Sequence, residues 1–208
     1  MSDSQTSRFT PAPLDASKRT WLIATSCAGV AGTAALATPF VSSFAPSERA
    51  KAAGASVEVD ISDLKPGEKI VVEWRGKPVW IMRRTPEQMA SLKKTEAELA
   101  DPQSQHKGYP TPAWAQNQGR AREEPPDVLV VVGICTHLGC SPVDKLQPGP
   151  QPSLPDNWEG GFFCPCHGST FDLAGRVYKN KPAPDNLEVP PYVYLSETRL
   201  LIGEEKTA

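Results

Sequence analysis

Residues 135–140 read CTHLGC and residues 164–169 read CPCHGS, so each of these short motifs supplies two cysteines and one histidine. Four of the five cysteines and two of the three histidines of the chain lie in them. Glycine in both motifs permits tight turns, and each motif follows an apolar segment. The sequence therefore predicts two compact loops whose sulfur and imidazole groups serve one site.

Three kinds of site compete for these six side chains. A structural zinc site needs four ligands, usually with Cys-x2-Cys or His-x3-His spacing, and six candidates in this arrangement fit that pattern poorly. Disulfides alone would leave both histidines unexplained. Two thiolates, two imidazoles and one further Cys–Cys pair match the ligand set of a Rieske [2Fe-2S] centre, in which two histidines replace two cysteines on one iron.

The segments around the motifs predict an antiparallel β domain of short strands and long turns. Thr85 followed by Pro86 predicts the start of a short helix that ends near Lys93. Residues 75–78 predict a turn between two strands. The predicted strands are residues 57–61, 70–74, 79–82, 127–134, 192–195 and 199–203.

Composition agrees with this fold class. The 208 residues carry 22 Lys and Arg against 24 Asp and Glu, a net charge of −2, which excludes nucleic-acid binding through a basic surface. The 22 prolines are about twice the usual share, which disfavours a helical bundle. Residues 100–126 show no periodicity, so we expect a surface loop of unassigned role, with a solvated His106 and a locally packed Trp114.

The N-terminal part contains no charged residue from Thr20 to Ser47. About 20 apolar residues span a hydrocarbon core of ~30 Å, so we predict a retained membrane anchor. A cleaved signal peptide, with a peptidase site near Ala45, is the main alternative, and a buried soluble helix is another. Lys18-Arg19 before the anchor resembles a twin-arginine export signal with Lys in place of the first Arg.

With these features together, the chain resembles the Rieske iron-sulfur subunits of bacterial quinol-cytochrome c reductases over essentially its whole length. The resemblance implies an all-β Rieske-type domain at residues 56–208, with a cluster-binding subdomain at about 134–185. It follows a cytoplasmic segment at 1–19, a transmembrane helix at 20–44 and a flexible tether at 45–55. The resemblance also implies that one [2Fe-2S] cluster is bound.

The same resemblance implies a role for each motif residue. Cys135 and Cys164 hold the inner iron, and His137 and His167 hold the outer one. Cys140 and Cys166 form a disulfide that ties the loops together. The remaining expected contributors to cluster tuning and docking are Leu138, Gly139, Gly168, Ser169, Phe171, Pro182 and Pro184.

Several of these roles have a physical reason. Backbone N–H groups at Gly168 and the hydroxyl of Ser169 can reach the cluster sulfurs, and such hydrogen bonds favour the reduced cluster. Leu138 and Gly139 would form an apolar tip, and the segment 181–184 (KPAP) resembles the proline-rich loop that covers the cluster. Phe171 stands where many relatives place Tyr, and Phe donates no hydrogen bond, so we expect a lower potential.

The implied function is electron transfer from quinol, at a site in cytochrome b, to cytochrome c1 within a dimeric bc1 complex, with His167 as the residue that contacts quinol. A disulfide requires an oxidising compartment, which places the domain in the periplasm and the anchor in the inner membrane. The small Rieske subunit of a periplasmic oxidase such as arsenite oxidase is the alternative. A soluble Rieske ferredoxin fits less well, because it lacks the anchor and the extra cysteine pair.

Overall fold

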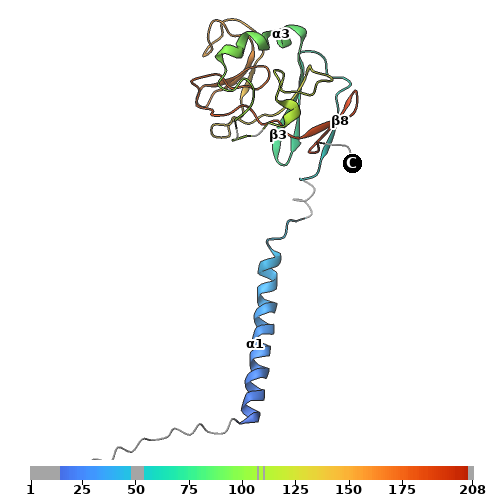
Figure 1. Ribbon diagram of the computed structural model, residues 1–208, viewed down its shortest axis with the longest axis vertical. Helices are drawn as coiled ribbons and strands as arrows, with labels where there is room; N and C mark the ends of the chain where they lie inside the picture. Colours follow the sequence, from blue (N-terminus) through green and yellow to red (C-terminus); the bar gives the residue numbers. More distant parts are fainter. Residues whose placement is uncertain (1–14, 48–53, 107, 110, 206–208) are drawn as a thin grey trace, which may run out of the picture. The chain divides into compact units, whose positions relative to one another are not determined.

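The computed structural model describes residues 15–47, 54–106, 108–109 and 111–205. The chain divides between Ala50 and Lys51 into two compact units, a helical one and a β one (Figure 1). Residues 1–14, with most of the expected N-terminal segment, and 48–53, with the middle of the expected tether, lie outside the described residues.

The N-terminal unit contains one helix, α1 (Ala16–Ser42), of 27 residues. Asp15 is its N-cap and accepts a hydrogen bond from the backbone N–H of Ser17. The helix therefore starts four residues before the uncharged stretch, because Lys18 and Arg19 are tolerated in an exposed first turn. It continues through Pro39 and ends two residues before the expected limit of 44.

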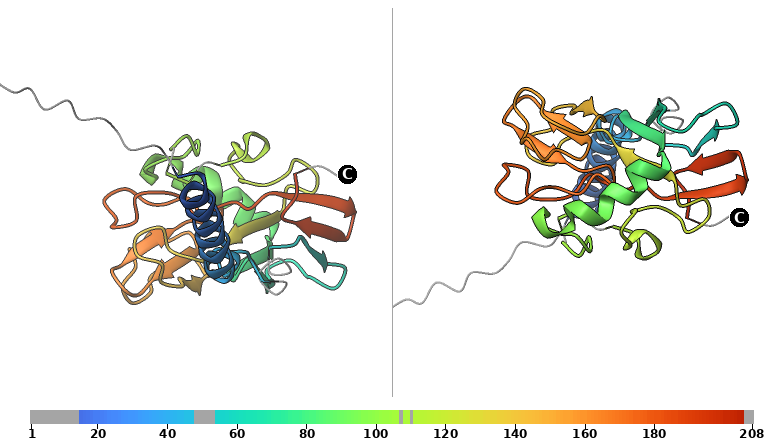
Figure 2. Two further views of the ribbon diagram at one scale, coloured as in Figure 1. Left: turned by 90° about the horizontal axis from the view of Figure 1, so that it is seen from below. Right: turned by 90° about the horizontal axis from the view of Figure 1, so that it is seen from above.

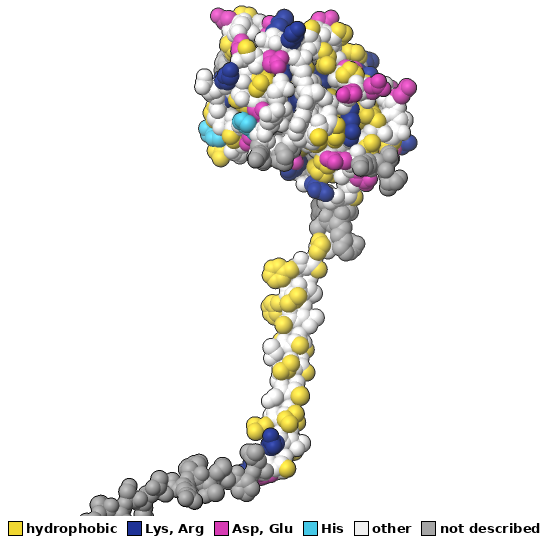
Figure 3. Space-filling model, in the orientation of Figure 1, with side chains coloured by type: hydrophobic (Ala, Val, Ile, Leu, Met, Phe, Trp, Pro, Cys, Tyr) yellow, Lys and Arg dark blue, Asp and Glu magenta, His cyan; other side chains and the backbone are white. Residues whose placement is uncertain are grey.

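All residues of α1 are exposed, and apolar side chains run along it (Figure 3). The helix is long and apolar enough to span a membrane. Six hydroxyl groups in α1 and at its C-cap donate to a carbonyl three or four residues earlier, which lowers the cost of placing them in lipid. These residues are Thr20, Thr25, Thr33, Thr38, Ser42 and Ser43.

The C-terminal unit consists of three three-stranded antiparallel sheets, which confirms the all-β prediction. Their orders are β1-β9-β8, β2-β3-β4 and β5-β6-β7. Figure 2 shows the third sheet at one end of the unit and β8 with β9 at the other. The bounds are β1 (Val57–Asp60), β2 (Lys69–Trp74), β3 (Lys77–Arg83), β4 (Val128–Val132), β5 (Val143–Lys145), β6 (Gly161–Cys164), β7 (Ser169–Phe171), β8 (Tyr192–Ser196) and β9 (Arg199–Ile202).

The turn between β2 and β3 is shorter than predicted. Arg75 and Gly76, with φ of 51° and 71°, form a two-residue turn, the geometry that matches the twist of a hairpin. Lys77 and Pro78 belong to β3, where Pro78 pairs with Glu73. The missing N–H of Pro78 costs little, because β4 pairs with β3 only from Val79 onward.

Strand β4 carries the chain into the first motif. All five of its residues are buried, and it pairs with β3 in the register Trp80↔Val131. At Gly133 a Cβ atom would lie 2.1 Å from the Trp80 ring. Only glycine therefore lets the backbone pass the indole and enter the motif in this position.

Helix α3 (Pro86–Thr95) confirms the predicted short helix and extends it by two residues. Its N-terminus is a capping box, in which Thr85 accepts from the N–H of Gln88 and the Gln88 side chain accepts from the N–H of Thr85. Leu92 on its inner face belongs to the core. The helix is therefore fixed both by its cap and by burial.

The surface-loop prediction for residues 100–126 is wrong for part of the segment. The 3₁₀ turn η2 (Ala113–Ala115) interrupts it, and Thr111, Ala115 and Arg120 are buried. The buried polar groups are tolerated because neighbouring backbone carbonyls accept their hydrogen bonds. His106 is half exposed, as expected, and Trp114 packs edge-on against Tyr192.

Candidate metal centre

The first motif forms a closed loop directly after β4. The N–H of Cys135 donates to the carbonyl of Cys140 at 2.8 Å, and the N–H of Gly139 donates to the carbonyl of Cys135 at 3.0 Å. Gly139 has a φ of +83°, a conformation that favours glycine. The loop therefore turns back on itself within six residues.

The second motif repeats this construction between β6 and β7. The N–H of Gly168 donates to the carbonyl of Cys164 at 3.0 Å, and Gly168 has a φ of +79°. In both loops the glycine comes four residues after the first cysteine. Cys164 pairs with Ser169 across the β6–β7 ladder, which fixes the base of the loop.

The two first cysteines are buried and free. Cys135 and Cys164 are each 2% exposed and belong to no disulfide. Burial is the main cause that raises the pKa of the Cys135 thiol, and hydrogen bonds from the backbone of His137 and the side chain of Ser169 oppose it. The neighbouring Cys164 thiol also raises the pKa of Cys135, so the two thiols lie close to each other.

The two remaining motif cysteines, Cys140 and Cys166, form a disulfide across a separation of 26 residues. This is the pair that the resemblance implied. The Sγ atoms of Cys140, Cys166 and Cys164 lie within 4.8 Å of one another. Because two of these three are bonded to each other, this group does not itself offer three thiolates to a metal.

The two motif histidines lie side by side. The ring centroids of His137 and His167 are 4.7 Å apart at an interplanar angle of 87°. His137 Nδ1 is buried without a hydrogen-bond partner, whereas His167 is exposed. The third histidine, His106, instead faces the Asp185 carboxylate at 3.4 Å.

A third loop holds both motifs, through contacts that the sequence did not reveal. The Thr136 hydroxyl donates to the carbonyl of Asp185 at 2.6 Å, and the N–H of Ala183 donates to the Ser169 hydroxyl oxygen at 3.0 Å. Ala183 is buried, and Pro182 and Pro184 on either side are exposed. The hydroxyl of Thr136 thus connects the first motif to the end of the proline-rich segment, and the hydroxyl of Ser169 connects the second motif to its middle.

The outer surface of the site is apolar and protruding. Leu138 is 71% exposed at the tip of the first loop, next to an exposed Gly139. Phe171 lies on the other side, fully buried and paired with Phe162 across the ladder. The histidine side chains lie at one edge of the β unit (Figure 3).

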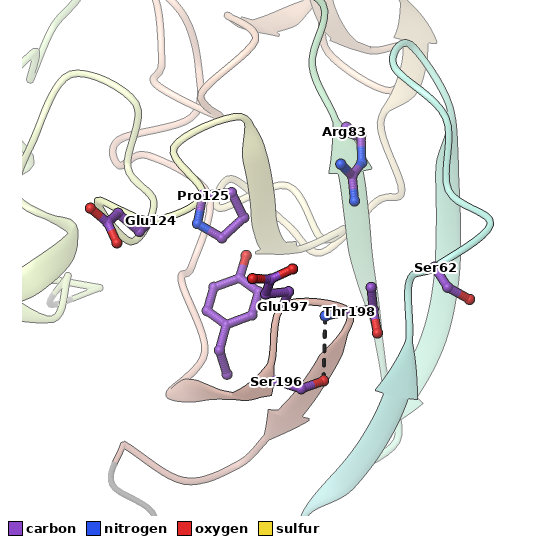
Figure 4. A pocket seen from close by; sticks show the side chains of 8 residues that line it. Ser62, Arg83, Glu124, Pro125, Ser196, Glu197 and Thr198 are labelled. Carbon is purple, nitrogen blue, oxygen red and sulfur yellow. Dashed lines mark hydrogen bonds between the residues drawn. The ribbon is translucent and has the colours of Figure 1, made fainter.

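A separate surface hollow of about 600 Å³ contains none of these donors. Figure 4 shows the side chains of Arg83, Glu124 and Glu197 around it. Among the residues described, its lining includes no cysteine or histidine. It is therefore distinct from the metal centre.

The donor set fits a [2Fe-2S] cluster. Two buried thiols that lie close to each other and two adjacent imidazoles match the ligands of a Rieske centre. The buried His137 Nδ1 has no hydrogen-bond partner within the described structure, and coordination to a metal would use its lone pair instead. Cys135 and Cys164 would hold one iron and the two histidines the other.

The comparisons with known proteins point to the same chemistry. Residues 56–192 match the family described as "Rieske [2Fe-2S] domain". A ubiquinol-cytochrome c reductase iron-sulfur subunit of Allochromatium vinosum is 50% identical over 91% of this chain and 89% of its own length. The subunit of the same name from Bradyrhizobium diazoefficiens is 41% identical over 87% and 90%. A solved chain titled "Hyperthermophilic respiratory Complex III" covers 86% of this chain and 97% of its own, with 28% identity and a TM-score of 0.43.

Proposed function

The chain belongs to the ubiquinol-cytochrome c reductase iron-sulfur subunits, with a Rieske [2Fe-2S] domain, and from this we propose how its residues take electrons and protons from quinol. The observation that carries the proposal is the pairing of two buried thiols with two adjacent imidazoles, one of them exposed. The relatives do not favour the alternative of an oxidase small subunit.

We assign Cys135 and Cys164 to the buried iron and His137 and His167 to the outer iron. For His137 the unpartnered, buried Nδ1 is the ligand atom, which leaves Nε2 on the outer side. A bound Rieske cluster accepts one electron at a time, at a potential that imidazole ligation raises to between roughly −150 and +300 mV.

The exposed imidazole of His167 receives the substrate. Its free ring nitrogen can accept a hydrogen bond from the hydroxyl of a quinol and would then take the proton, while one electron would pass from the quinol to the bound cluster. Leu138 supplies an apolar contact surface beside it, suited to a quinol pocket that excludes water. Cytochrome b would form that pocket, and cytochrome c1 would receive the electron.

The helical unit supports a location at a membrane. Helix α1 is apolar, exposed and internally hydrogen-bonded. We propose that it anchors the chain in the inner membrane of a bacterium, with the β unit in the periplasm, where the Cys140–Cys166 disulfide is stable. Lys18 and Arg19 would then belong to a twin-arginine export signal, and the subunit would work within a dimeric complex.

The ligand assignment predicts that Cys135→Ser, Cys164→Ser, His137→Ala and His167→Ala each abolish the low-temperature electron spin resonance signal of the reduced cluster, because each removes a primary ligand. Membranes from cells that express the full chain provide the sample. Two matched controls use residues outside the motifs, Cys27→Ser and His106→Ala, and should keep the normal spectrum. A normal spectrum in any ligand variant would refute the assignment.

Replacement of Cys140 or Cys166 by Ser should have a weaker effect. The disulfide joins the loops but donates no ligand, so we expect cluster to be present in reduced amount and to be lost faster on warming. The rate of loss of the spin resonance signal measures this. Damage equal to that of the ligand variants, or none at all, would contradict the proposed role of the disulfide.

A further inference from the structure

Arg120, in the long irregular segment 100–126, is a buried cation that hydrogen-bonds chain segments next to the metal centre. Its side chain is fully buried, and its backbone has a φ of +49°. Nη1 donates to the carbonyls of Ala174 and Gly175, both at 3.2 Å. Nη2 donates to the carbonyl of Leu187 at 2.7 Å and to the Thr111 hydroxyl at 3.1 Å.

The bonded carbonyls belong to the two segments that close the cluster site. Ala174 and Gly175 lie in the turn that directly follows β7, and Leu187 comes four residues after Ala183. At their other ends these two segments meet in the hydrogen bond from Ala183 to Ser169. Leu187 also donates its N–H to the Gly175 carbonyl at 2.8 Å. The guanidinium therefore holds together the chain segments that carry the second motif and the proline-rich loop.

The charge of Arg120 is not neutralised by a hydrogen-bonded carboxylate in the described structure. The buried charged side chains of that structure are three arginines and two aspartates. Of these, Arg176 pairs directly with Asp172 at 2.7 Å. Arg84 donates to carbonyls such as those of Gly119 and Leu173. Burying a cation whose hydrogen-bond acceptors are neutral, here three carbonyls and one hydroxyl, costs free energy. A functional reason for this buried charge is therefore worth seeking.

We propose that Arg120 is a positioning residue for the cluster. Its fixed, buried positive charge raises the reduction potential of the cluster, and its hydrogen bonds hold together the segments that close the site. The inference rests on the proposed function, in which the two motifs bind the cluster. Reduction adds one negative charge, and a fixed cation in a medium of low polarity favours the more negative state. Burial lowers the pKa of Arg120 to about 10, which leaves the group charged at neutral pH.

The first test replaces the charge. Arg120→Met in the full membrane-bound chain should keep the spin resonance signal but lower the equilibrium constant for reduction about threefold, equivalent to ~28 mV for a one-electron couple. Redox titration at pH 7 measures it. The matched control is Arg75→Met, which removes an arginine from an exposed turn and should leave the potential unchanged. A potential equal to that of the unaltered protein in Arg120→Met would overturn the proposal.

The second test removes a negative charge near Arg120 and leaves Arg120 itself in place. Two buried carboxylates act on the charge of Arg120, Asp172 more strongly and Asp101 less. Asp172 is already paired with Arg176, whereas the Asp101 carboxylate accepts only from the backbone N–H groups of Gln105 and His106 among the hydrogen bonds of the described residues. Asp101→Asn is nearly isosteric and should raise the equilibrium constant for reduction about two- to threefold, ~18 to 28 mV. A general loosening of the fold would not raise it, so an unchanged or lower potential would overturn the proposal. If Arg120→Met fails to assemble, Arg120→Gln, which also removes the charge but keeps a hydrogen-bond donor, should lower the potential by the same amount.

The proposed function and the role of Arg120 can be refuted separately. Absence of a Rieske-type signal from the unaltered protein would refute the proposed function itself. A normal signal whose potential does not respond to either substitution would refute only the role of Arg120.

Discussion

The chemistry of this site depends on how each side chain is buried and what it contacts. Cys135 and Cys164 are equally buried, lie close to each other and have no disulfide partner. His137 hides one ring nitrogen, and His167 is open to solvent. Under the proposed ligation the two imidazoles would therefore differ in role: His137 would serve only as a ligand, and His167 would also be available to a substrate.

Phe171 offers a test of tuning by a single hydroxyl. Phe171→Tyr would add an O–H donor to a ring that is fully buried on β7. Hydrogen bonds to charged groups contribute ~1.5 to 3 kcal/mol. The hydroxyl would bond an anionic sulfur in both the oxidised and the reduced cluster, so only the difference between the two bond free energies changes the potential. We expect this difference to be about 1 kcal/mol. For a one-electron couple this raises the potential by roughly 40 mV, which redox titration at fixed pH would detect.

Phe163→Tyr is the matched control for this change. Phe171 on β7 pairs with Phe162 on β6, and Phe163 is the next residue of β6. Because side chains alternate along a strand, Phe163 points to the opposite face of the sheet. It should leave the potential unaltered. A Phe171→Tyr variant with an unchanged or lower potential would show that its ring does not point toward a ligand cysteine.

The residues with distinctive chemistry were predictable from the sequence, whereas those that support them were not. Cysteine and histidine are scarce in this chain, so their concentration in two motifs was visible at once. The bond from Thr136 to the carbonyl of Asp185 joins residues 49 positions apart. The acceptors of Arg120 are also mostly carbonyls, which every residue possesses. Neither contact leaves a signal in a single sequence.

At the scale of elements, the periodic segments and the capped helix were predicted, and the shortest strands were missed. Strands β5 and β7 have three residues each and β6 has four, too few for an alternation of polar and apolar residues to be recognised. They are held in place by the loops they flank. Helix α3 had an explicit start signal in Thr85-Pro86, and the structure bears it out.

The cap of α3 predicts a measurable contribution to stability. Thr85→Ala removes the acceptor for the Gln88 N–H and should lower the free energy of unfolding by about 1 kcal/mol, or the midpoint of thermal unfolding by roughly 2–4 °C. Thr85→Ser keeps the hydroxyl and should be close to neutral. An unaltered midpoint in the alanine variant would mean that burial of Leu92 alone fixes the helix.

At the scale of the whole molecule, the anchor features and the site features fall in different units. The residues of α1 are all exposed, and the buried core is made by residues of the β unit. Residues that could anchor the chain and residues that could carry the chemistry therefore belong to separate parts. Each part can be tested without the other.

Removal of residues 1–53 should separate anchoring from cluster binding. We expect the shortened protein to be recovered without membranes and to show the same spin resonance spectrum, because all the proposed ligands and the core lie in the β unit. The full chain should resist extraction by alkaline carbonate. Release of the full chain by carbonate, or a mature N-terminus near Ala45, would contradict a retained anchor.

The placement of the ligand loops within the β unit has a mechanical consequence. The sheet that carries β5, β6 and β7 lies at one end of the unit and the sheet that contains β1 at the other (Figure 2). A compact unit of this size is roughly 35–40 Å across. If the unit turned by about 30° around the start of β1, the imidazoles would move through ~20 Å, by the same size estimate. The Cys140–Cys166 disulfide and the hydrogen bonds of Thr136 and Ser169 would keep the ligand loops in one shape during such a rotation. A small rotation at the β1 end of the unit would then produce a large displacement of the imidazoles at the other end.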